Sequence, residues 1–206
     1  AKNIFVLTNS IDLKYENLYK RVLTDSNEPL RILFLGRLVD SKGTNVIIDA
    51  MELIQKIGIK IKFICAGDGL DKNFFIQEMS NILYEHFVYV GVVSGMKKME
   101  LIDKSDILLL PSIHGEGLPV ALLETMARGV VPITTTDGSI SVVVESGKNG
   151  LIVAKNSSQE IANQIGVLNS NRLLLKLLSD NASETILKNF NPNIYINTLN
   201  KIYDNG

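Results

Sequence analysis

Short apolar segments alternate with longer amphipathic ones along most of this chain, and no other feature constrains its fold as strongly. The short segments are rich in Ile, Val and Leu, which favours strands. Strands are expected near residues 31–36, 60–66, 87–91, 106–111, 131–135 and 151–153. Helices are expected near residues 44–57, 72–84, 97–104, 119–128, 158–168, 172–189 and 193–203. Apolar strands joined by helical crossovers predict an α/β domain, with a Rossmann-like parallel sheet and helices on both faces.

The length of the sequence fits one such domain. A typical domain holds about 100–200 residues, and this chain has 206. We interpret residues 1–28 as a linker or lead-in and residues 29–206 as the domain itself.

Composition argues against several classes of function. The net charge of −1 gives no broad basic face for nucleic acid. No apolar run reaches the roughly 20 residues that a membrane span needs. The single Cys65 excludes an internal disulfide and is expected to be a buried thiol. Only two histidines are present, and no Cys/His cluster predicts a zinc site.

Two acidic residues, Glu116 and Glu124, lie eight positions apart around a predicted loop and helix. Pro119 suits the first turn of that helix, and Gly129 suits the position just past its end. One carboxylate would lie at the mouth of the loop and the other inside the helix. Pro119 to Glu124 rises roughly 7.5 Å along a helix, so the pair could hold two hydroxyl-bearing parts of one long ligand. The alternative is one Glu that favours the helix dipole and one exposed helical Glu.

Two cations lie in a second loop, between the strand at 31–36 and the helix that starts at residue 44. Arg37 follows the strand at once, and Lys42-Gly43 precedes the helix. Open α/β sheets bind ligands at such strand ends, and a helix N-terminus offers N–H donors to phosphate. Arg and Lys both bind phosphate oxygens. The alternative interpretation is a solvated basic turn.

Taken together, these motifs resemble the family-4 retaining glycosyltransferases of the GT-B fold, also called group 1. That family carries a strand ending in Gly-Arg-Leu, a Lys-Gly soon after, and Glu-Gly-x-Gly/Pro with a second Glu eight residues after the first. The matching residues here are Gly36-Arg37-Leu38, Lys42-Gly43, and Glu116-Gly117-Leu118-Pro119 through Glu124. Order and spacing agree over residues 30–155. The sequence departs from the family at Gly138–Val142, where the Pro and Glu of the frequent Gly-Gly-x-Pro-Glu are missing.

The resemblance implies a role for each matched residue. Arg37 and Lys42 would neutralise the diphosphate of the donor. Glu124 would accept hydrogen bonds from the ribose, and Glu116 would contact the transferred sugar. The strand end at Val92 would lie by the nucleobase, and N–H groups from Gly117 onward would face the sugar or phosphates. The implied catalytic residues are Arg37, Lys42 and Glu116, and the implied donor contacts are Gly36, Arg37, Lys42, Val92, Glu116, Gly117, Leu118, Pro119 and Glu124.

The resemblance also implies the wider biochemistry. The chain would be the C-terminal, donor-binding half of a GT-B enzyme, and it would be inactive without the N-terminal acceptor domain. Its substrate would be a UDP-, GDP- or ADP-sugar, transferred with retention, without metal or cofactor, in bacterial polysaccharide synthesis. A cytoplasmic location is expected, and a peripheral contact of the intact enzyme with a membrane stays open. Alternatives are a non-catalytic nucleotide-sugar binding module, or another GT-B enzyme such as an epimerase or phosphorylase.

Overall fold

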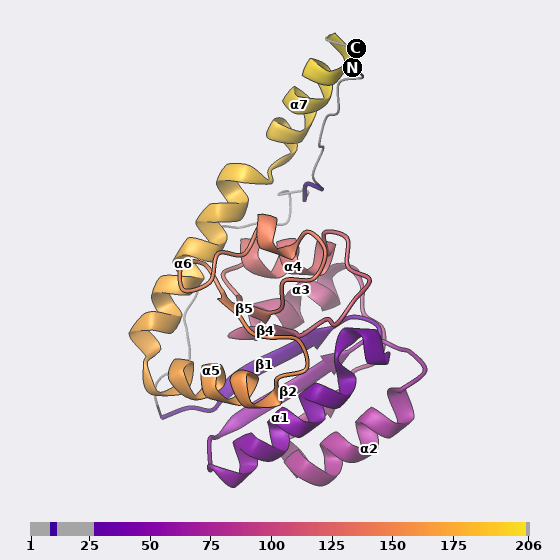
Figure 1. Ribbon diagram of the computed structural model, residues 1–206, viewed down its shortest axis with the longest axis vertical. Helices are drawn as coiled ribbons and strands as arrows, with labels where there is room; N and C mark the ends of the chain where they lie inside the picture. Colours follow the sequence, from indigo (N-terminus) through magenta and orange to yellow (C-terminus); the bar gives the residue numbers. More distant parts are fainter. Residues whose placement is uncertain (1–8, 12–26, 205–206) are drawn as a thin grey trace.

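The computed structural model describes residues 9–11 and 27–204, and a six-stranded parallel sheet forms their centre (Figure 1). The strands run in the spatial order β3-β2-β1-β4-β5-β6, and every neighbouring pair is parallel. This arrangement confirms the predicted Rossmann-like α/β fold. The lead-in predicted at residues 1–28 falls largely outside the described residues. The strands are β1 Leu30–Leu35, β2 Ile61–Ala66, β3 Phe87–Tyr89, β4 Ile107–Leu110, β5 Val131–Thr134 and β6 Leu151–Ile152.

Each helix predicted from the sequence is present, with ends that differ by a few residues. The predicted strand at 87–91 is shorter than expected: β3 ends at Tyr89, and Gly91 has a φ of 72°, which is not a strand conformation. The helices are α1 Thr44–Lys56, α2 Lys72–Leu83, α3 Gly95–Asp103, α4 Val120–Ala127, α5 Ser158–Ser170, α6 Arg172–Asn189 and α7 Pro192–Asp204. Single 3₁₀ turns, which the sequence did not predict, are η2 Asp40–Lys42, η3 Tyr84–His86 and η4 Ile140–Val142.

Helices cover both faces of the sheet, as predicted. Alternate residues of β1 point to opposite faces, so Ile32 and Phe34 join one apolar core while Leu33 joins the other. The first core lies under α1, α2 and α5, and the second lies under α3 and α4 (Figure 1). Helix α6 contributes buried residues to both cores and thereby ties the two layers together.

Helix α7 continues from the end of α6 and projects beyond the sheet and its covering helices (Figure 1). Phe190, at the end of α6, is the last residue of the second core. Across the part of the chain with assigned structure, we find no helix that is both long and apolar enough to cross a membrane.

Cys65 lies in β2 and is fully buried, which confirms the predicted buried thiol. Burial raises the pKa of this thiol to about 12, because the apolar interior disfavours the thiolate. The residue therefore acts as a small apolar core side chain.

Candidate functional site

The direction in which the strands follow one another reverses between β1 and β4. The chain winds outward from β1 in one direction through β2 and β3, and in the other through β4, β5 and β6. Loops at the carboxyl ends of β1 and β4 therefore leave the sheet side by side and turn to opposite faces. Open α/β sheets bind their ligands at such a switch point. The basic loop and the loop that carries Glu116 are these two segments.

Direct backbone contact holds the two loops together. The N–H of Ile113 donates a hydrogen bond to the carbonyl of Ser41 at 2.9 Å. Gly43 has a φ of 77°, and a Cβ at this position would lie 2.5 Å from the carbonyl oxygen of Pro111. Only glycine fits such an approach without strain. The 3₁₀ turn that ends at Lys42 is thereby pressed against the loop after β4.

Lys42 and Glu116 form an ion pair across this junction. The Nζ of Lys42 lies 2.5 Å from Oε1 of Glu116, and the Oγ of Ser112 donates to the same oxygen at 2.6 Å. The side chains of Lys42 and Glu116 are only 11% and 7% exposed. The structure thus brings together two residues that the sequence assigned to different parts of the donor. No partner for Oε2 of Glu116 is found among the described residues.

Asp137 holds the backbone of Glu116 from the neighbouring strand end. Its Oδ2 accepts the N–H of Glu116 at 2.9 Å, and its Oδ1 accepts Nζ of Lys155 at 2.6 Å. Hydrogen bonds from Lys155 and then from the Glu116 N–H lower the pKa of Asp137, because both donors favour the charged carboxylate. The site therefore contains two ion pairs, Lys155–Asp137 and Lys42–Glu116, which are joined by the hydrogen bond from the N–H of Glu116 to Asp137.

Glu124 lies in α4 and has a lysine partner of its own. Oε1 of Glu124 accepts a hydrogen bond from Nζ of Lys98 in α3 at 2.6 Å, and the two side chains are 17% and 23% exposed. Pro119 is the residue before α4 and not part of its first turn, since its ψ of 122° is extended. Its carbonyl accepts hydrogen bonds from Leu122 and Leu123 and so starts the helix. Gly129 lies just past the helix, as predicted, with a φ of 71°.

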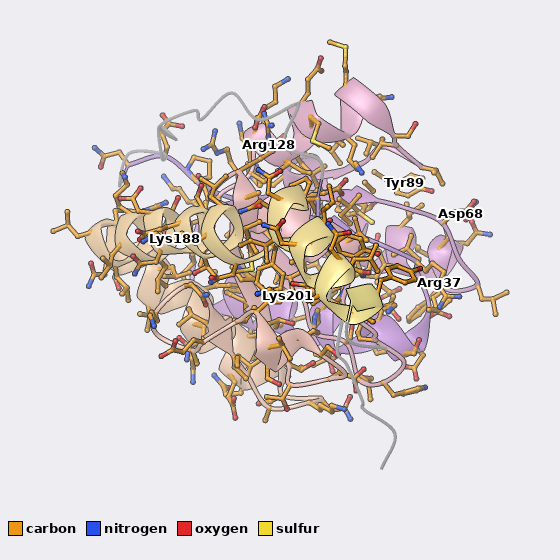
Figure 2. All side chains as sticks on the ribbon, turned by 90° about the horizontal axis from the view of Figure 1, so that it is seen from above. Arg37, Asp68, Tyr89, Arg128, Lys188 and Lys201 are labelled. Atoms are coloured by element: carbon orange, nitrogen blue, oxygen red, sulfur yellow. The ribbon has the colours of Figure 1, made fainter. Side chains whose placement is uncertain are left out.

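Arg37 differs from the other predicted site residues because it is exposed. No ion pair or hydrogen bond joins its side chain to any described residue. Figure 2 shows Arg37 on the same side of the molecule as Asp68 and Tyr89. Two hydrogen bonds support that placement: the N–H of Leu38 donates to the carbonyl of Asp68 at 2.9 Å, and the hydroxyl of Tyr89 donates to the carbonyl of Gly67 at 2.8 Å.

The loops after β1, β2 and β3 are packed against each other in turn. Gly36 donates to the carbonyl of Ala66 at 3.0 Å, and Gly67 donates to that of Gly91 at 2.9 Å. A Cβ on Gly67 would lie 1.8 Å from the carbonyl oxygen of Gly36. Val92 follows Gly91 and is 75% exposed, at the carboxyl edge where the sequence places it.

The carbonyls of Gly117 and Leu118 accept hydrogen bonds from other parts of the protein. The carbonyl of Gly117 accepts from the N–H of Ser139 at 3.1 Å, and that of Leu118 accepts from Nδ2 of Asn9 at 2.9 Å. The side chain of Leu118 packs against the second core.

His114 is exposed. Within residues 9–11 and 27–204, no three His, Cys, Asp or Glu side chains form a group that could hold a metal ion.

Sequence reasoning missed four residues of this site: Ser112, Asp137, Lys155 and Lys98. Ser112 comes directly after the strand predicted at 106–111, and Asp137 lies two residues after the strand predicted at 131–135. A polar residue at a strand end is the signal that could have found them. Val142 stands where the family has a Glu, but Asp137 supplies a carboxylate at the same strand end. Lys155 likewise follows the last strand, whereas Lys98 lies in a helix and carries no local signal.

Known proteins share this sequence pattern and this fold. The family model described as "Glycosyl transferases group 1" matches residues 16–185. An uncharacterized glycosyltransferase of Methanocaldococcus jannaschii, MJ1069, is 30% identical over 186 residues, which is 90% of this chain and 47% of that protein. The capsular polysaccharide biosynthesis glycosyltransferase CapM of Staphylococcus aureus is 26% identical, over 93% of this chain and 49% of CapM. The chain thus spans about half the length of these relatives.

Solved structures share the fold at lower identity. The C-terminal domain of the group 1 glycosyltransferase LpcC from Francisella tularensis has a TM-score of 0.71 at 24% identity, over 79% of this chain and 87% of that domain. Anabaena Alr3699/HepE, solved in complex with UDP-glucose, has a TM-score of 0.74 at 21% identity, over 87% of this chain and 50% of that protein. Because the family match extends over most of the sequence, the chain belongs to the group 1 glycosyltransferases.

Proposed function

We propose that this chain is the donor-binding half of a glycosyltransferase and that a nucleoside diphosphate sugar binds along the carboxyl edge of its sheet. The observation that carries the proposal is the Lys42–Glu116 pair at the switch point between β1 and β4. A nearly buried cation and carboxylate at this point suit a ligand with adjacent anionic and hydroxyl groups. The Anabaena Alr3699/HepE structure, which holds UDP-glucose, supports the choice of ligand.

The diphosphate would bind between Arg37, Lys42 and the N-termini of α1 and α4. Neither helix has a side-chain hydrogen bond at its N-cap, so their first N–H groups suit phosphate oxygens. Arg37 is exposed and its guanidinium can form a paired contact with phosphate. Negative charge grows on the departing diphosphate during transfer, and these fixed positive groups would stabilise it in place of a metal ion.

The two glutamates would bind the hydroxyl groups on either side of the diphosphate. The lysine hydrogen bonds of both side chains go to Oε1. Oε2 of Glu116 would accept from the transferred sugar, and Oε2 of Glu124 would accept from the ribose. Val92 would face the base. These contacts position the donor, which is a different role from nucleophilic attack.

In the whole enzyme, the glycosyl group would pass with retention to an acceptor held by a second domain, without metal or cofactor. The half-length match to CapM and the Methanocaldococcus protein supports a second domain of comparable size. The role of CapM in capsular polysaccharide biosynthesis supports a polysaccharide as the product. The chain alone would bind the donor without transferring its sugar.

Isothermal calorimetry of this chain against UDP, GDP and ADP and against their sugar conjugates tests the proposal. We expect saturable binding of one nucleotide series, and loss of that binding in Lys42→Met. The matched control is Lys56→Met, which removes a 70% exposed lysine at the other end of α1. Binding of none of the three series, or equal binding by Lys42→Met and the unmodified chain, would refute the assignment.

A further inference from the structure

The segment that carries Glu116 has little packing of its own to hold it. Glycines flank Glu116 on both sides, and a Cβ at Gly115 or Gly117 would meet nothing within 4 Å. Glycine gives the backbone wide freedom, and the loop there is exposed. Lys42 and Ser112 hold the Glu116 carboxylate itself, so the position of the backbone that carries it depends on hydrogen bonds from outside the segment.

The loop after β5 supplies the bonds to the backbone of Glu116 and Gly117. Asp137 accepts the N–H of Glu116, and Ser139 donates to the carbonyl of Gly117 at 3.1 Å. A Cβ on Gly138 would lie 2.0 Å from the carbonyl oxygen of Glu116, so the two backbones touch. The hydroxyl of Thr135 donates to the carbonyl of Ser112. Asp137 provides the only charged group among these contacts.

Lys155 then fixes Asp137 from the loop after β6. Its Nζ lies 2.6 Å from Oδ1 of Asp137, while Oδ2 is bonded to the Glu116 N–H. The Asp137 side chain is 10% exposed and that of Lys155 is 40% exposed. Each carboxylate oxygen thus has one donor, and the Lys155 contact orients the carboxylate toward Glu116.

We propose that Asp137 and Lys155 are positioning residues that keep Glu116 where its carboxylate can hydrogen-bond to the transferred sugar. This inference rests on the proposed function, and it concerns only how Glu116 is held in place. Neither residue contacts the two loop cations Arg37 and Lys42 through any bond in the described structure. Their loss should therefore weaken the part of donor affinity that comes from the sugar and leave nucleoside diphosphate affinity almost unchanged.

Calorimetry with a nucleoside diphosphate and its matching sugar conjugate separates the contribution of the sugar to donor affinity from that of the nucleoside diphosphate. The readout is the ratio of the two dissociation constants, measured in the series that the unmodified chain binds. Asp137→Ala should reduce the sugar-dependent part of affinity by about tenfold, since it removes a charge-assisted bond. Lys155→Met should reduce it less, by about threefold, because the Asp137–Glu116 bond persists. Lys155→Arg, which keeps the cation, should restore the ratio.

Lys148→Met is the matched control, because Lys148 forms an ion pair with Glu145 on the surface, where both side chains are about two-thirds exposed. Lys155→Met leaves the core untouched, so it tests the inference even where Asp137→Ala does not fold. An unchanged ratio in Lys155→Met, or a loss in which both ligands weaken equally, would overturn the positioning role and leave the proposed function standing. Failure of the unmodified chain to bind any nucleotide would instead overturn both.

Discussion

The ammonium of Lys42 and the carboxylate of Glu116 lie 2.5 Å apart, although 74 residues separate them in the sequence. Both side chains are nearly buried, so each neutralises the charge that the other brings into the site. Donor binding must then use an ion pair that already exists. The anionic diphosphate would approach the Lys42 side of the pair and the sugar hydroxyls the Glu116 side.

Breaking this pair should destabilise the chain. We expect Lys42→Met to lower the free energy of unfolding by about 3 kcal/mol, because it leaves a buried carboxylate without its cation. The double variant Lys42→Met with Glu116→Gln should recover most of that loss, since no buried charge remains. Urea denaturation gives the free energy of unfolding of the unmodified chain, of Lys42→Met and of the double variant. Lys56→Met, which removes an exposed partner of Glu52, should change stability by less than about 1 kcal/mol. A double variant no more stable than Lys42→Met would contradict this account.

Glu124 should contribute to recognition of ribose. Glu124→Gln is expected to weaken binding of a ribonucleoside diphosphate by about tenfold, because a hydrogen bond to a charged acceptor is lost. Binding of the 2′,3′-dideoxy analogue should stay nearly constant. Calorimetry with both ligands provides the comparison, and Glu100→Gln on the exposed part of α3 is the control. Equal weakening for the two ligands would remove Glu124 from the ribose site.

The contact between Gly138 and Glu116 should tolerate no side chain. Gly138 and Gly147 both have positive φ, 56° and 79°, but only Gly138 faces another backbone at clashing distance. Gly147→Ala should cost about 1 kcal/mol for its backbone conformation alone. Gly138→Ala should cost at least about 2 kcal/mol, since it adds a backbone clash. Denaturation curves compare the stability of Gly138→Ala and Gly147→Ala directly. Similar losses of stability in the two variants would mean that the loops after β4 and β5 can move apart.

Acid should remove the contribution of Asp137 to stability. Hydrogen bonds from Lys155 and the Glu116 N–H hold the pKa of Asp137 in the folded chain below its ordinary value of about 3.9. Its contribution is therefore fully present above about pH 5 and is lost as pH falls through the folded pKa. The stability difference between the unmodified chain and Asp137→Asn should be constant from about pH 5 to 7 and shrink toward about pH 3.

Asp68→Asn is the control for this pH series. A hydrogen bond from Lys72 lowers the pKa of Asp68 as well, but the side chain is 55% exposed and water screens it. We expect a much smaller stability difference for Asp68→Asn at every pH. A difference for Asp137→Asn that grows in acid would show that Asp137 is not held as a carboxylate.

The fold could be predicted well from the sequence because strands, helices and turns leave signals within short stretches of residues. Apolar runs such as Ile107–Leu110 and positive-φ positions such as Gly129 are visible in short windows. The same local evidence placed Lys42 and Glu116 at strand ends. Their pairing depends on β4 lying beside β1, which is a property of strand order that no local window contains.

The bonds that support the site were harder to predict for the same reason. Lys155 reaches Asp137 because β6 pairs with β5, and Lys98 reaches Glu124 because α3 and α4 cover the same face. The shortened β3 and the extended backbone of Pro119 each depend on one or two dihedral angles. A propensity argument gives such angles only as tendencies.

A crystal structure of this chain soaked with the nucleotide that it binds would test the central claim most directly. We predict that diphosphate oxygens lie within hydrogen-bonding distance of Lys42 and Arg37, with the ribose hydroxyls at Glu124 and the Lys42–Glu116 pair still in contact. A nucleotide bound away from the β1–β4 switch point, or one whose phosphates contact neither cation, would contradict it.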